Sequence, residues 1–151
     1  MADTWVDLLT DDHEVAADPH PQYQLAVDLS FKRAVRAVAT ANVSSLSGTT
    51  TIDGVSLVAT DRVLLTAQST GADNGVYVVA AGAWSRATDL NVSAEFHPGV
   101  AVVVGEGTVG AGKIYYFATT GAFTLGSTAQ TWTTIGYQAT AEKDVASGYQ
   151  G

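Results

Sequence analysis

Hydrophobic and polar residues alternate along most of this chain with the two-residue period of a β-strand. From residue 34 onward, short runs rich in Val, Ile, Thr and Tyr are separated by Gly, Asn and Asp. This pattern is typical of all-β proteins. We therefore predict an all-β fold, a small antiparallel sandwich or barrel-like domain over residues 34–136, preceded by an extended N-terminal arm. Strands are expected at 34–40, 49–52, 55–58, 62–67, 75–80, 83–88, 99–105, 113–120 and 129–136.

Turn residues punctuate these strands at the expected places. Asp53-Gly54 separates two short β-prone runs and predicts a two-residue hairpin. Ala81-Gly82 predicts a second hairpin, and Val100 to Val104 is the most apolar run, which should lie in the interior of a sheet. Large aromatic side chains in the strands are expected to anchor the core. They are Trp84, Tyr115, Phe117, Phe123 and Trp132.

The formal charge is concentrated at the N-terminus. Residues 1–30 contain seven acidic residues and no Lys or Arg, whereas the rest of the chain has eight acidic and seven basic residues. A chain with so few basic residues lacks the phosphate-neutralising charge that nucleic acid requires, so no nucleic-acid partner is expected. The anionic arm suits a basic protein surface or divalent cations, and simple solubility is the alternative. We assign residues 1–33 to docking or oligomerisation.

Residues 23–31 alternate strictly between apolar and polar positions, which predicts a strand with one buried face. A helix competes, because Leu25 and Leu29 are four residues apart, but Tyr23 and Phe31 would then lie off its apolar stripe. A one-sided strand needs a neighbouring sheet or chain for stability. The expected partner or oligomer interface comprises Asp18, His20, Pro21, Tyr23, Leu25, Val27 and Leu29.

The sequence carries no recognisable catalytic motif. It has no cysteine, which excludes disulfides and thiolate chemistry, and no Gly-x-Ser-x-Gly, His-Glu-x-x-His or phosphate loop. Gly105-Glu106-Gly107 contains the Gly-x-Gly pattern of a dinucleotide-binding loop, but no helix is expected after it, so dinucleotide binding is not predicted. Asp61-Arg62, and Glu95 with Arg86, suggest acid/base pairs, but most acids of the domain lie in turns. We expect no enzymatic activity, no cofactor and, because the apolar runs are short, no membrane insertion.

Two kinds of ligand site remain open in the sequence. Three copies of His20 in a trimer could bind a metal, although one His per chain closes no site and no metal is predicted. The acids Asp3, Asp7, Asp11, Asp12 and Glu14 lack the calcium-loop spacing. Trp84 and Arg86 on one strand face could stack a sugar or form a cation–π pair, with core packing as the alternative. Tyr116 is the aromatic residue expected to point outward.

Several motifs occur in a fixed order between residues 34 and 136. They are Val35-Arg36-Ala37-Val38-Ala39-Thr40, Leu46-Ser47-Gly48, Thr51-Ile52-Asp53-Gly54-Val55-Ser56-Leu57, Asp61-Arg62-Val63-Leu64-Leu65, Asn74-Gly75-Val76-Tyr77-Val78-Val79, Ala83-Trp84-Ser85-Arg86-Ala87-Thr88-Asp89, Pro98-Gly99 and Thr131-Trp132. This succession resembles a small β module that recurs in tail fibres, tail spikes and related appendage proteins of tailed bacteriophages.

Both ends of the chain add to this resemblance. Asp18-Pro19-His20-Pro21-Gln22-Tyr23 looks like the Asp-x-His-Pro-Gln-Tyr element of phage fibre and head or neck appendage proteins. Residues 141–149 resemble the joint that leads into further fibre repeats, so 137–151 is expected to be a C-terminal tail or truncated linker.

The resemblance implies a structural virion protein, assembled in the host cytoplasm as a homotrimeric fibre or spike subunit that binds other tail or capsid proteins. The alternatives are a carbohydrate-binding module for a host surface glycan and a capsid decoration protein.

Overall fold

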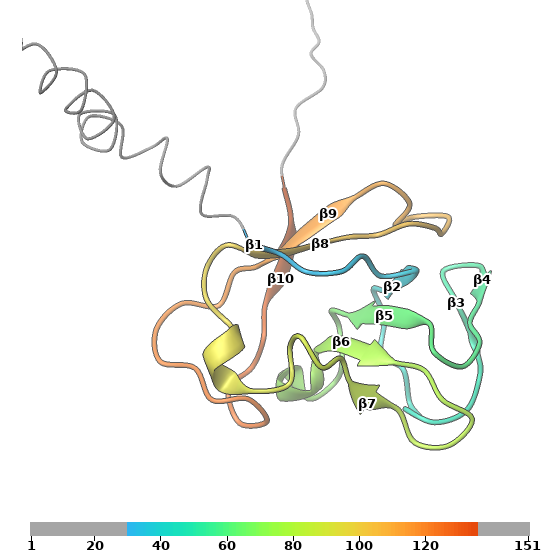
Figure 1. Cartoon of the computed structure of the whole chain (residues 1–151), viewed down its shortest axis with the longest axis horizontal. Helices are drawn as coiled ribbons and strands as arrows, with labels where there is room; N and C mark the ends of the chain where they lie inside the picture. Colours follow the sequence, from blue (N-terminus) through green and yellow to red (C-terminus); the bar gives the residue numbers. More distant parts are fainter. Residues whose placement is uncertain (1–29, 136–151) are drawn as a thin grey trace, which may run out of the picture. The chain divides into compact units, whose positions relative to one another are not determined.

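The computed structural model describes residues 30–135, and these residues form an all-β domain (Figure 1). Ten short strands and two 3₁₀ turns make up the regular structure of this part of the chain. In chain order the elements are β1 (Ser30–Phe31), β2 (Ala37–Ala39), β3 (Thr51–Ile52), β4 (Val55–Ser56), β5 (Arg62–Leu65), η1 (Gly71–Asp73), β6 (Gly75–Val78), β7 (Ser85–Arg86), η2 (Ser93–Glu95), β8 (Val100–Val103), β9 (Ile114–Phe117) and β10 (Trp132–Thr134).

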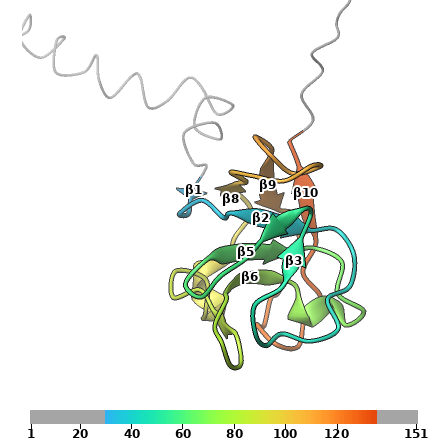
Figure 2. The same ribbon diagram turned by 90° about the vertical axis from the view of Figure 1, so that its right-hand side faces the viewer.

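The strands form two four-stranded sheets and a hairpin. One sheet has the order β1-β8-β9-β10, the other has the order β2-β5-β6-β7, and β3 pairs with β4 alone. The two larger sheets lie one over the other in both views (Figures 1 and 2). Every strand range predicted between residues 34 and 136 contains one observed strand, and the apolar β8 is an interior strand of its sheet, as predicted.

One segment, residues 32–39, hydrogen-bonds to both sheets. The N–H groups of Lys32 and Val35 donate to the carbonyls of Ala101 and Val103 on β8, at 2.8 and 2.9 Å. One residue later the N–H of Arg36 donates to the carbonyl of Arg62, and β2 then pairs with β5. Sheets that share a strand in this way form a barrel-like corner. Because the segment runs parallel to both β5 and the end of β8, the domain is not purely antiparallel.

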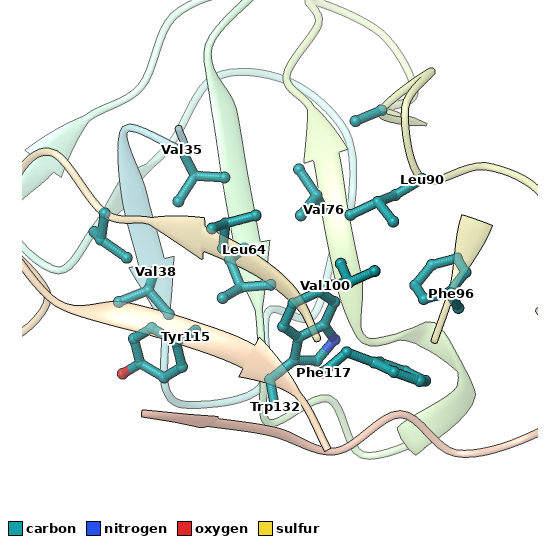
Figure 3. Packing of buried hydrophobic residues seen from close by; sticks show 13 residues of the cluster. Val35, Val38, Leu64, Val76, Leu90, Phe96, Val100, Tyr115, Phe117 and Trp132 are labelled. Atoms are coloured by element: carbon teal, nitrogen blue, oxygen red, sulfur yellow. The ribbon is translucent and has the colours of Figure 1, made fainter. Parts of the chain in front are cut away.

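The strand β5 is buried on both faces, and this gives the domain two apolar clusters. Leu64 points into the larger cluster between the sheets, which also contains Val38, Phe117 and Trp132 (Figure 3). Val63 and Leu65 point the other way, into a second cluster closed by the β3–β4 hairpin. A strand buried on both faces needs a continuous apolar run, which is what Val63-Leu64-Leu65 supplies. Of the predicted core anchors, Trp84, Tyr115, Phe117 and Trp132 are buried, and Phe123 packs against the larger cluster.

A buried arginine holds the shared segment in place. The side chain of Arg62 is 7% exposed and donates to the carbonyls of Arg33 and Ala34, at 3.0 and 3.2 Å. Its two terminal nitrogens donate to the two carboxylate oxygens of Asp89, at 3.0 and 3.1 Å. Burial alone would raise the pKa of Asp89, but the hydrogen bonds and charge of Arg62 outweigh it and lower that pKa. The fold therefore stabilises the ionised carboxylate of Asp89, which forms an ion pair with the guanidinium of Arg62.

A second polar network joins the loop before β6 to the loop before β10. The backbone N–H of Gln130 donates to Gly71 at 3.0 Å, and the side-chain amide of Asn74 donates to the carbonyl of Gln130 at 2.9 Å. The indole N–H of Trp132 donates to the side-chain oxygen of Gln130 at 3.1 Å. Asn74 and Gln130 are 5% and 2% exposed, so these bonds satisfy groups that would be costly to bury alone.

Replacing Asp89 by Asn should destabilise the domain by about 2–3 kcal/mol, because it leaves the Arg62 guanidinium buried without a counter-charge. Asp73→Asn is the matched control, since Asp73 is exposed and its carboxylate makes no hydrogen bond among residues 30–135. Urea unfolding followed by tryptophan fluorescence measures both variants. Equal midpoints for the two would refute the role given to Arg62.

The same pair predicts an acid-labile component of stability. Because the folded-state pKa of Asp89 is lower than its unfolded value, its contribution is complete above about pH 4 and is lost as pH falls through the folded pKa. The fall in unfolding free energy between pH 6 and pH 3 should therefore be smaller in Asp89→Asn than in the wild type. A fall of the same size in both proteins contradicts the assignment.

Candidate functional site

The indole of Trp84, one of the predicted glycan-facing groups, lies in the core. Trp84 is 7% exposed, belongs to the second apolar cluster, and donates its indole N–H to the carbonyl of Gly48 at 2.8 Å. A sugar ring needs an open aromatic face to stack on, and this indole offers none. The glycan-facing assignment of Trp84 is corrected accordingly, and the alternative of core packing holds.

Arg86 also has an internal role. Its guanidinium donates to the carbonyls of Asn74 and Ala72, at 2.9 and 2.8 Å, and lies 4.9 Å from the centre of the Tyr77 ring. The cation–π partner of Arg86 is therefore Tyr77 and not Trp84. Burial raises the pKa of Tyr77, although the charge of Arg86 opposes the shift, and its hydroxyl donates to the carbonyl of Asp73. Through these contacts Arg86 joins β7 to the turn before β6.

Tyr116 is the predicted glycan-facing residue that keeps an accessible ring. It is half-buried on β9, between two buried residues, Tyr115 and Phe117. Its cross-strand neighbours are Ala101 on β8 and Thr133 on β10. Tyr116 therefore lies on the sheet face that points away from the larger apolar cluster.

A polar cleft of about 370 Å³ opens beside Arg36 on the surface of the domain. Its lining consists of Arg36, Asp53, Gly54, Val55, Ser56, Glu106, Gly107 and Thr108. Arg36 donates to Asp61 at 2.7 Å, to Glu106, and to the carbonyl of Ser56 at 3.2 Å. The hydrogen bonds to Glu106 and then to Asp61 raise the pKa of Arg36 further above its usual range. The charge of the cleft's arginine is thus already matched by carboxylates of the same domain.

The loop between β8 and β9 binds an anion that the chain itself supplies. The carboxylate of Asp53 accepts hydrogen bonds from the N–H groups of Val109 and Gly110, at 2.9 and 2.8 Å. Successive backbone N–H groups of a glycine-containing loop commonly hold a phosphate in this way. Here the site is filled by Asp53, whose hairpin turn has the positive φ angles (53° at Asp53, 80° at Gly54) of a type I′ turn. The predicted hairpin is confirmed, and the loop is a structural contact.

The acidic residues of the described domain are dispersed, and all of them except Asp73 are individually bonded. Asp61 is paired with Arg36, Asp89 with Arg62, and Glu95 accepts the N–H groups of Asn91 and Val92 at 2.7 and 3.0 Å. Within residues 30–135 no hydrogen bond or ion pair joins Arg86 to Glu95 or Arg62 to Asp61, so the acid/base pairs suggested by the sequence are not formed.

Residues 30–135 contain no group of three His, Asp or Glu side chains that could hold a metal ion. Nor does this part of the chain include a helix of the length and apolarity that crossing a membrane requires.

The predicted arm interface lies outside the described residues. This applies to Asp18, His20, Pro21, Tyr23, Leu25, Val27 and Leu29, and to the acidic residues before them. The same is true of the tail, residues 137–151. These assignments stay predictions.

Comparisons with protein-family models, with curated proteins and with solved structures find no match to this chain. Its function is therefore inferred from its own residues. Sequence reasoning missed the Asn74–Gln130 network and the Arg36 cleft, because both join residues that are distant along the chain. The one local signal was Gln130, an amide residue two positions before the core residue Trp132.

Gly110→Ala should destabilise the domain by about 2 kcal/mol, because the added Cβ would lie 2.5 Å from the buried Val38 side chain and 3.2 Å from the Asp53 carboxylate. Gly82→Ala is the matched control: no atom lies within 4 Å of its added Cβ, and we expect a change within about 0.5 kcal/mol. Chemical unfolding curves compare the two. Indistinguishable curves would show that the β8–β9 loop is not packed as described.

Proposed function

We propose that this chain is a structural protein of a tailed-bacteriophage particle, a subunit of a homotrimeric fibre or spike that is attached through its N-terminal arm. The observation that carries the proposal is the uneven distribution of charge along the chain. Residues 30–135 contain six acidic and six basic residues, so the β domain is formally neutral, whereas residues 1–29 carry seven acidic residues and no basic one. A neutral scaffold with a strongly anionic end suits assembly onto a basic partner surface.

The internal use of polar groups supports a scaffold role. Arg36, Arg62 and Arg86 each bond to acceptors of the domain itself. Asp53, Asp89 and Glu95 likewise accept hydrogen bonds from the domain. A reacting centre needs groups that remain available to a substrate, and these groups hold loops and strands instead.

The motifs behind the phage resemblance have structural roles here. Arg36 and Arg62 fix the segment shared by the sheets, Asp53-Gly54 forms the β3–β4 turn, and Asp89 pairs with Arg62. Each of these motifs therefore contributes contacts that build the same β domain. This supports the resemblance as a likeness of fold-determining residues.

In this proposal the protein acts by assembly. The arm gains its structure on a partner, and the conformational entropy that it loses is offset by buried interface and by charge complementarity. A capsid decoration protein would work in the same way at a different place on the particle. The carbohydrate-binding alternative has less support, because Trp84 is in the core and Arg86 bonds to backbone carbonyls.

Deleting residues 1–24 should abolish attachment to the particle and leave the β domain folded. Purified full-length and truncated chains are added to phage particles produced without this protein, and the bound fraction is measured after sedimentation.

The acidic side chains at the start of the arm should contribute a salt-sensitive part of this binding, because salt screens charge–charge attraction over a length of about 8–10 Å. Replacing them by their amides should therefore weaken binding and reduce its salt dependence; they are Asp3, Asp7, Asp11, Asp12 and Glu14.

Asp73→Asn is the control, since it changes an exposed acid of the domain and should leave attachment unchanged. If the truncated chain still decorates particles, the arm does not attach the protein. Binding of the truncated domain to a glycan array would favour the carbohydrate-binding alternative.

A further inference from the structure

Asn74 is followed directly by Gly75, and this is the one Asn-Gly pair among the three asparagines of the chain. An asparagine deamidates when the backbone nitrogen of the next residue attacks its side-chain amide carbon. Glycine favours this attack, because it has no Cβ to hinder the approach and its backbone rotates easily. Asn42 and Asn91 are both followed by valine, whose branched side chain hinders the nitrogen. The sequence alone therefore makes Asn74 the most reactive asparagine of the protein.

The structure blocks this reaction by holding the side-chain amide of Asn74 at both ends. The amide oxygen accepts the backbone N–H of Gln68 at 2.8 Å, and the amide nitrogen donates to the carbonyl of Gln130 at 2.9 Å. Asn74 is 5% exposed, and its ψ angle is 165°. Ring closure requires the Gly75 nitrogen to eclipse the Cβ of Asn74, and this extended ψ angle turns the nitrogen away from that position.

The packing around Gly75 explains why the reactive pair is present at all. The φ angle of Gly75 is +130°, which side-chain-bearing residues rarely adopt. A Cβ at this position would lie 2.7 Å from the guanidinium of Arg86 and 3.0 Å from the side-chain oxygen of Gln130. The fold therefore requires glycine at position 75 and the two-ended amide of Asn74 before it, and the same network that needs the pair protects it.

Opening of the segment from η1 to the start of β6 would remove this protection. The Gly75 nitrogen then forms a bond to the side-chain carbon of Asn74, the bond from that carbon to its amide nitrogen breaks, and ammonia leaves with the proton of the attacking N–H. Water opens the resulting succinimide ring at either of its two carbonyl carbons. The products are aspartate and isoaspartate at position 74, and the reaction needs only water.

Neither product restores the original contacts. A carboxylate has no N–H to donate, so one of its oxygens would face the carbonyl oxygen of Gln130 as a second acceptor. The nearest printed cationic contact, Arg86, already donates to the carbonyls of Asn74 and Ala72. Isoaspartate in addition lengthens the backbone by one carbon directly before β6. Deamidation would therefore weaken the contact between the loops before β6 and β10.

We propose that Asn74 is a modification site gated by the fold. It is stable while its bonds to Gln68 and Gln130 are intact, and it deamidates when the segment opens, which weakens the domain irreversibly. Because local opening and closing are fast compared with deamidation, the deamidation rate follows the fraction of time that the segment is open. This inference goes beyond the proposed function and does not depend on it.

The first test compares the folded and unfolded full-length chain. Both are incubated in the same mildly alkaline buffer, one of them with urea above the unfolding midpoint, and peptide mapping by mass spectrometry measures amide loss at each asparagine. Asn74 should deamidate faster in urea by about tenfold or more. Asn42 and Asn91 are internal controls, and in urea both should deamidate more slowly than Asn74.

A matched pair of substitutions tests the gate in the folded protein. In Gly71→Ala the added Cβ would lie 2.9 Å from the Cβ of Ala129, so it pushes η1 away from the loop that carries Gln130. In Gly82→Ala the added Cβ meets no atom of the described chain within 4 Å. Without urea, Asn74 should deamidate several-fold faster in Gly71→Ala and at the wild-type rate in Gly82→Ala.

The consequence of the modification is measured with Asn74→Asp. Asn42→Asp is the matched control, because Asn42 is exposed and its side-chain oxygen accepts the N–H of Ser69 at 2.7 Å, a bond that a carboxylate retains. The urea midpoint should fall by about 1 M in Asn74→Asp and change little in Asn42→Asp.

Equal deamidation of Asn74 with and without urea overturns the proposal, and so do equal urea midpoints for the two aspartate variants. A Gly71→Ala protein that is folded and deamidates at the wild-type rate shows that the contact with the loop before β10 is not the gate. If Gly71→Ala does not fold, the urea comparison and the aspartate variants decide the question.

Discussion

The guanidinium of Arg62 is the group on which the two-sheet arrangement depends. One segment, residues 32–39, is hydrogen-bonded first to β8 and then to β5, and a chain that changes sheets leaves carbonyls without strand partners at the crossing. Arg62 donates to two of these carbonyls, Arg33 and Ala34, while Asp89 neutralises its charge. Without this fork the carbonyls of Arg33 and Ala34 would lose their hydrogen-bond donor at the crossing between the sheets.

The remaining polar groups of the domain follow the same logic. Asp53 occupies the backbone N–H groups of the β8–β9 loop, Gln130 and Asn74 join the loops before β10 and β6, and Arg86 bonds to carbonyls beside Tyr77. Short strands of two to four residues supply few ladder hydrogen bonds, so side chains have to complete the pairing that longer strands would provide. The polar side chains named here therefore bond to other groups of the same domain.

Groups available to other molecules are accordingly found where this internal pairing is absent. The acidic arm, residues 1–30, contains seven acidic residues and no Lys or Arg, whereas residues 31–135 contain as many basic as acidic residues. In the proposed function, this uneven charge is what suits the arm to a basic partner surface.

The sequence by itself determined the all-β class, the position of each strand in the domain, the Asp53-Gly54 turn and most of the core anchors, because these follow from period-two alternation and from local turn chemistry. It left Trp84 open between a core position and a glycan-facing one, and only the structure decided for the core, where Trp84 is 7% exposed; Tyr116, expected to point outward, is half-buried. Nor could it find the pairs Arg62–Asp89 and Asn74–Gln130, which are separated by 27 and 56 residues. Only the tertiary structure decided these, because the partner of a buried polar group is set by which loops the sheets bring together, and that distance is not encoded in any local pattern.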